Sequence, residues 1–142
     1  MAYIQTLPRQ DLRRYRKILD TTLAGTFNMG PLEEGWDANF RFWIISIHLA
    51  LADSAWLANP SVTLGTGGVP TTLINPAVSL PNLLGYQRVR IPTGASGTDL
   101  VAPLEDLSAS VTVPGVVSTP GHSPLISIDY IGFWMPLASA VI

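Results

Sequence analysis

The stretch that decides the fold is residues 107–134, LSASVTVPGVVSTPGHSPLISIDYIGFW. Its two ends, Leu107–Val113 and Leu125–Trp134, alternate apolar and polar residues, and the residues between them are rich in Pro, Gly and Ser. Alternation with a period of two is typical of a strand with one buried face, and Pro and Gly favour turns. The pattern therefore predicts two β-strands separated by turns.

Prolines divide the wider region at equal intervals. They stand at positions 70, 81, 92, 103 and 114, each 11 residues after the last. Because proline cannot donate to a hydrogen-bond ladder, it is found at strand starts, edges and turns, and short strands every 8 to 12 residues or so are typical of all-β domains. A further alternating segment, Leu84–Ile91, fits this scheme. We predict a mainly β (α+β) fold, a β-sandwich or barrel of short strands; chance spacing, or an extended arm with little sheet, is the alternative.

The segment Phe40–Leu57 is compatible with two structures. Phe40, Trp43 and Ile47 recur at helical spacing, whereas residues 45–51 alternate as in a strand. Enrichment in aromatic and β-branched residues favours a buried strand over 40–51, followed by a helical turn that ends at Asn59 and Pro60. Helix remains the alternative for the whole segment.

The N-terminal segment Pro8–Leu23 has the pattern of an amphipathic helix. Thr6 is a suitable N-cap and Gly25 a suitable stop. One face carries an apolar stripe, composed of Leu12, Tyr15, Ile18, Leu19 and Leu23. The sequence RRYRK, residues 13–17, is interpreted as a solvated helix face, with docking of an acidic protein partner as the alternative; one basic helix without interleaved aromatic residues does not favour nucleic acid.

Length and patterning predict a single domain over residues 1–142. We expect the helix within 1–25, a loop over 26–39 and a β domain over 40–142 with an extended C-terminal segment. The loop contains Glu33, Glu34 and Asp37, which we interpret as an exposed acidic loop, because one short segment without histidine is a poor cation site.

Charge is distributed unevenly along the chain. The net charge is −2, five of the eight Lys and Arg residues fall within 9–17, and only six charged residues occur from Pro60 onward. Six in 83 residues is about 7%, against about 25% in an ordinary soluble domain. A small monomer needs a charged surface to stay unassociated, so we expect other subunits to cover much of this exterior.

The sequence offers little for catalysis, cofactors or metals. It has no Cys and two histidines: His48, expected to be a core histidine, and His122, in a Pro- and Gly-rich loop. No nucleophile elbow, P-loop, dinucleotide fingerprint or zinc motif is present. No signal-peptide pattern and no apolar run of about 20 residues is found. We predict a protein that is not an enzyme, needs no cofactor, binds no small-molecule substrate and enters no membrane.

Function is therefore predicted from composition. A charge-poor β chain rich in Pro and Gly resembles, in kind and without a diagnostic motif, the small virion proteins of tailed bacteriophages. That resemblance implies a capsid decoration or cement subunit, or a head–tail connection subunit, made in the host cytoplasm and bound to copies of itself and to a larger assembly such as a capsid. The alternative is a secreted or surface β-sandwich module that binds carbohydrate or protein, with Trp36, Trp56 or Trp134 stacking on sugars.

The residues expected at interfaces are arginines and C-terminal apolar residues. Arg88 and Arg90, the two arginines after Pro60, are expected to pair with Asp99, Glu105 or Asp106, within or between chains. The uncharged C-terminus, residues 131–142, is expected to form either a last core strand or an arm on an adjacent protomer. The interface candidates are Arg13, Arg14, Arg16, Arg88, Arg90, Phe133, Trp134, Leu137, Val141 and Ile142.

Overall fold

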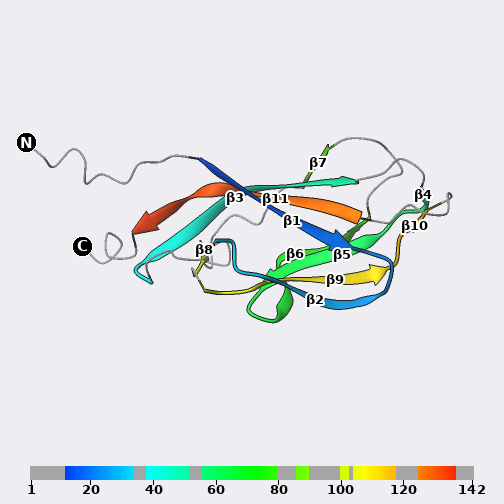
Figure 1. Cartoon of the computed structure of the whole chain (residues 1–142), viewed down its shortest axis with the longest axis horizontal. Coiled ribbons are helices and arrows are strands. Elements are labelled where there is room, and N and C mark those ends of the chain that lie inside the picture. Colours follow the sequence, from blue (N-terminus) through cyan, green and yellow to red (C-terminus); the bar gives the residue numbers. More distant parts are fainter. Residues whose placement is uncertain are drawn as a thin grey trace, which may run out of the picture.

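All regular structure in the described part of the chain is β-strand. The computed structural model describes residues 12–33, 38–51, 56–79, 86–89, 100–102, 104–117 and 125–136. The strands are β1 (Arg13–Asp20), β2 (Gly25–Gly30), β3 (Phe40–Leu51), β4 (Trp56–Ala58), β5 (Ser61–Thr66), β6 (Val69–Ser79), β7 (Tyr86–Val89), β8 (Leu100–Val101), β9 (Leu107–Val113), β10 (Val116–Val117) and β11 (Leu125–Pro136) (Figure 1). The prediction of a mainly β fold is confirmed. These residues contain no helix of the length and hydropathy needed to cross a bilayer.

The strands form two antiparallel sheets. Sheet A has the order β1-β11-β3-β7, and β8 also pairs with β3. Sheet B has the order β2-β9-β5-β6, and β10 pairs separately with β4. A two-residue turn links β5 to β6, where Gly67 and Gly68 have φ angles of 62° and 82°. Positive φ at both positions is characteristic of the tightest hairpins and is readily adopted by glycine.

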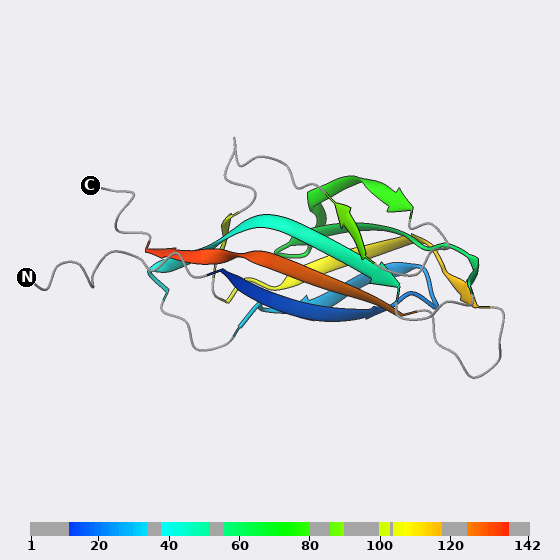
Figure 2. The same ribbon diagram turned by 90° about the horizontal axis from the view of Figure 1, so that it is seen from above.

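The two sheets are stacked and share one hydrophobic core (Figure 2). In β11, Ile126, Ile128 and Tyr130 are fully buried and contribute to this core. They alternate with residues that point to the opposite face, as the pleat of a strand requires. Sheet B contributes residues from three strands: Val62, Leu64, Leu73, Ile74, Leu107, Ala109 and Val111.

Strands β3 and β11 form the longest pairing, and a bulge interrupts it at Gly132. The bulge leaves Ile45 as the extra residue of β3, because Ile131 pairs with Ser46 and Gly132 with Ile44. A Cβ atom on Gly132 would lie 1.9 Å from the carbonyl oxygen of Trp43. Only glycine therefore allows this close backbone approach without a shift of β3.

The predicted N-terminal helix is wrong over the residues that the structure describes. Arg13–Asp20 forms β1, which pairs with β11 over all eight residues. Tyr15 is half-buried and Leu19 is buried, whereas Ile18 is exposed. Pairing with a neighbouring strand outweighs the local helical pattern, since the same residues also alternate with a period of two. Residues 1–11 lie outside the described residues.

The structure corrects two shorter predictions and confirms three others. Residues 26–30 belong to β2 instead of a loop, because they pair with β9, and Trp56–Ala58 pairs with β10 instead of forming a helical turn. The strand interpretation of Phe40–Leu51 is confirmed. Strand β9 has the predicted bounds, and β11 extends the predicted strand by two residues to Pro136.

Candidate interaction face

The outer face of sheet A is formed by the side chains that alternate with the core residues of β1, β11 and β3. On β11 these are the odd-numbered residues from 127 to 135. Antiparallel pairing places residues of the three strands in rows across this face. One row contains Arg14, Ile131 and Ser46, and the next contains Arg16, Asp129 and His48.

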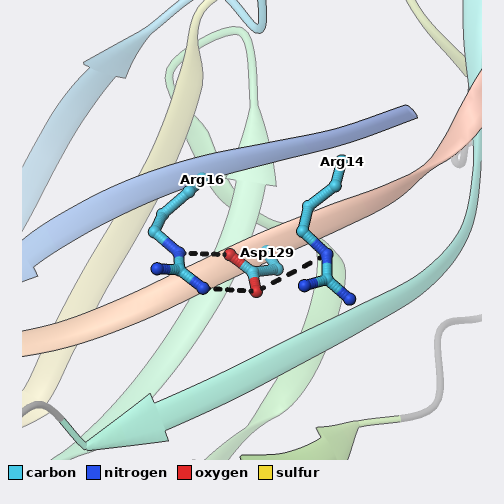
Figure 3. A network of polar contacts seen from close by, with 3 residues as sticks. All are labelled: Arg14, Arg16 and Asp129. Atoms are coloured by element: carbon cyan, nitrogen blue, oxygen red, sulfur yellow. Dashed lines mark hydrogen bonds and ion pairs between the residues drawn. The ribbon is translucent and has the colours of Figure 1, made fainter.

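A buried carboxylate with two arginine neighbours lies at the centre of this face. Arg16 donates from Nε to Oδ1 of Asp129 at 2.8 Å and from Nη2 to Oδ2 at 3.2 Å (Figure 3). The Nε of Arg14 lies 3.9 Å from Oδ2 of the same carboxylate. The side chain of Asp129 is 0% exposed, whereas those of Arg14 and Arg16 are 54% and 50% exposed. Asp129 therefore orients Arg16, and both guanidinium groups remain accessible to a partner.

The charged row continues across the sheet to β7. His48 pairs in register with Asp129 on one side and with Arg88 on the other. The expectation that His48 is a core histidine is wrong: it is half-buried on the outer face, because Ile47 and Leu49 occupy the core positions on either side of it. The register therefore places Arg16, Asp129 and His48 in one row, with the backbone of Arg88 beyond His48.

An exposed aromatic pair lies on the same face, beyond the row of Arg14, Ile131 and Ser46. The rings of Trp43 and Phe133 meet edge to face, with centroids 5.2 Å apart and an interplanar angle of 73°. Trp43 is 38% exposed, and Ile45, the extra residue of the bulge, is 44% exposed. Ile131 and Met135 of β11 are half-buried on the same face. The face therefore combines a contiguous apolar end with a cationic centre, a combination found in protein interfaces.

The structure brings together only some of the residues expected at interfaces. Arg14, Arg16 and Phe133 share the outer face of sheet A, and Arg13 is exposed at the start of β1. Trp134 instead lies in the core, 5% exposed. The backbone of Arg88 is placed by its pairing with His48. Arg90, Leu137, Val141 and Ile142 lie outside the described residues.

Sequence reasoning missed Asp129, Trp43 and Ile45 as members of the face. The available signal was the similarity between the segments ISIH (45–48) and ISID (126–129). Two strands of the same pattern are suited to pairing, and β3 and β11 do pair, with His48 opposite Asp129. The bulge that exposes Ile45 has no comparable signal beyond Gly132 itself.

A chain of hydrogen bonds joins the acidic segment after β2 to the core. Trp134 donates from Nε1 to the hydroxyl of Tyr15 at 2.8 Å, and that hydroxyl donates to Oε2 of Glu33 at 2.5 Å. The rings of Tyr15, Trp134 and Phe42 are mutually in contact. Burial, followed by the hydrogen bond to Glu33, raises the pKa of the Tyr15 phenol. The phenol therefore stays protonated, and its hydrogen bond holds Glu33 against Tyr15. Glu33 has a structural role here.

The outer face of sheet B has a different chemistry. Its side chains are neutral and mostly hydroxyl-bearing, and they include Thr26, Asn28, Ser110 and Thr112. The molecule therefore presents one apolar and cationic face and one neutral polar face.

In the described part of the chain, no three His, Asp or Glu side chains gather as a metal site would require. Comparison of the chain with protein-family models, with curated proteins and with solved structures gave no match in any of the three.

Proposed function

We propose that this protein is a structural assembly subunit of β-sandwich form that joins copies of itself to a larger particle. The observation that carries the proposal is the Trp43–Phe133 pair on the outer face of sheet A, with exposed Ile45 beside it. Arg14 lies in the adjoining row and Arg16 in the row beyond it. Aromatic side chains and arginine are enriched at protein interfaces.

The neutral composition supports the same function. Of the residues after Pro60, Leu104, Val113 and Val116 are 76%, 47% and 46% exposed. Apolar surface of this kind gains about 25 cal/mol per Å² when a partner removes it from water, a gain that the ordering costs of association partly offset. Association that covers this surface would therefore be favourable.

The kind of assembly follows from the resemblance in composition to small virion proteins of tailed bacteriophages. We propose a capsid decoration or cement subunit, or a head–tail connection subunit, located in the virion and without enzymatic activity. In this proposal, deletion of residues 137–142 is expected to weaken assembly more than it weakens folding of the single chain.

The test is the mass of the purified protein in dilute buffer, with two matched variants. Ile45→Lys places a charge on the outer face of sheet A, and Val69→Lys makes the same change at the start of β6, where the side chain is similarly exposed at 51%. We expect the masses of wild type and Val69→Lys to be well above the 15.3 kDa of one chain. The mass of Ile45→Lys should be smaller than theirs. Equal masses for the two variants would show that the outer face of sheet A does not take part in association.

A carbohydrate-binding module is the second candidate. The exposed ring of Trp43, with half-exposed arginines in the next rows, also suits the stacking of a sugar. A wild-type protein that is a well-behaved monomer and binds a glycan array through Trp43 would favour this module over the assembly subunit.

A further inference from the structure

Most sheet edges in the described part of the chain carry a feature that discourages pairing with another strand. Strand β1, at one edge of sheet A, contains four basic residues, and β7 and β8, at the other edge, have four and two residues. Strand β6, at one edge of sheet B, contains Pro70 and Pro76, and its pairing with β5 is irregular. Charge, proline, irregularity and shortness are the usual means by which proteins protect sheet edges.

Strand β2 forms the remaining edge. Its sequence, GTFNMG over residues 25–30, contains no charge and no proline, although its pairing with β9 shifts register between Asn28 and Gly30. It pairs with β9 on one side and, among the described residues, with no strand on the other. In Figures 1 and 2, β2 lies beside β9 at the end of sheet B away from β6. An uncharged edge strand of six residues is a template for an added strand.

The core side of β2 is also incompletely covered. Phe27 and Met29 pack against the core but remain only partly buried. A hollow of about 320 Å³ adjoins the start of β2, lined by Asp20, Thr22, Leu23 and Phe27. Leu23 in this hollow is 70% exposed. A strand added at this edge would therefore cover apolar surface as well as form main-chain hydrogen bonds.

We propose that β2 pairs antiparallel with β2 of a second copy, about a two-fold axis, and so joins the two B sheets into one. This inference rests on the proposed function, since it supplies one of the contacts between copies. Opposite residues of an antiparallel pair point to the same face, so Phe27 and Met29 of the two copies lie together on the core side. The Met29 end of the second copy then lies beside the hollow at the Gly25 end of the first. An uncharged strand is suited to self-pairing because it places no like charges opposite each other.

Hydrogen exchange of the full-length wild-type protein tests the pairing directly. Amide exchange is measured over a range of protein concentrations. We expect the peptide that covers β2 to become protected as the concentration rises, while peptides from β6 keep the same exchange rate. Exchange of β2 that does not depend on concentration, in a protein whose mass shows association, would overturn the inference and leave the proposed function standing.

A charge exchange at Thr26 provides the second test. Thr26 is exposed on the outer side of β2, and Thr71 is exposed on β6, so Thr71→Lys is the matched control. Thr26→Lys alone and Thr26→Glu alone are each expected to raise the dissociation constant of the β2 contact, because like charges of the two copies then lie on the same face of a short strand pair. A mixture of the two variants is expected to regain the wild-type contact, which a loss of folding would not allow.

The possible outcomes separate the two proposals. Pairing through β2 is supported when three results are found together. Both Thr26 variants associate weakly, their mixture recovers wild-type association, and Thr71→Lys has no effect. Wild-type association by all variants refutes the pairing alone. A wild-type protein that is monomeric at every concentration refutes both the pairing and the proposed function.

Discussion

Replacing Arg16 with alanine removes both hydrogen bonds that its guanidinium group donates to the buried carboxylate of Asp129, at 2.8 and 3.2 Å. Hydrogen bonds to a charged group contribute about 1.5–3 kcal/mol to stability. The half-exposed position of Arg16 and the presence of Arg14 at 3.9 Å both reduce the loss. We expect Arg16→Ala to lower the free energy of unfolding by about 2 kcal/mol.

Arg14→Ala is the matched control, because the two arginines lie on the same strand with nearly equal exposure. The 3.9 Å approach of Arg14 to Asp129 is too long for a hydrogen bond, so its loss should cost less than about 0.5 kcal/mol. The double variant removes both guanidinium groups from a carboxylate that is 0% exposed. We expect it to cost about 4 kcal/mol, more than the sum of the single changes, because each arginine partly compensates for loss of the other.

Urea denaturation followed by tryptophan fluorescence measures these differences, and an unchanged m value would show that the unfolded state is not altered. Strict additivity of the two changes, or a larger loss for Arg14→Ala than for Arg16→Ala, would refute the assignment of Arg16 as the principal partner of Asp129.

Three further changes test the packing. Gly132→Ala is expected to cost about 2 kcal/mol or more, because its Cβ would lie 1.9 Å from the carbonyl oxygen of Trp43; an unchanged Tm would show that the bulge can widen. Tyr130→Phe is expected to stabilise the protein by about 1 kcal/mol at neutral pH, since the buried hydroxyl makes no hydrogen bond to the described residues. Burial raises the pKa of Tyr130, so the wild type should lose stability above about pH 10, where the phenol ionises in the unfolded state and not in the folded state; an equally steep alkaline loss in Tyr130→Phe would contradict this. Tyr15→Phe removes the hydrogen bond to Glu33 and should cost about 1–2 kcal/mol in thermal or chemical unfolding, with Glu33→Gln, which keeps an acceptor, costing less than Tyr15→Phe.

The strands that the sequence predicted best are those with strict alternation and clear turn residues at their ends. Strand β9, Leu107–Val113, contains no charged residue and is followed by Pro114, and its alternating residues Leu107, Ala109 and Val111 are buried. The same logic failed at Arg13–Asp20, where helical and strand periodicities coexist and the decision depends on β11, more than 100 residues away. Long-range pairing of this kind leaves no local signal.

The sequence predicts which types of residue form the candidate face, but not which individual residues belong to it. Arginines and C-terminal aromatic residues were expected at an interface, and Arg14, Arg16 and Phe133 share the outer face of sheet A. Trp134, next to Phe133, points into the core because adjacent residues of a strand face opposite sides. That assignment requires the orientation of β11 relative to the core, which composition does not determine.

We propose that association covers the outer face of sheet A. Hydroxyl-radical footprinting measures the solvent accessibility of Trp43 and Phe133 in the associated protein and in the dilute protein. We expect strong protection of both rings on association, while Leu57, 71% exposed on β4, serves as a reference outside sheet A. Equal labelling of Trp43 in the associated and dilute protein would show that association does not cover this face.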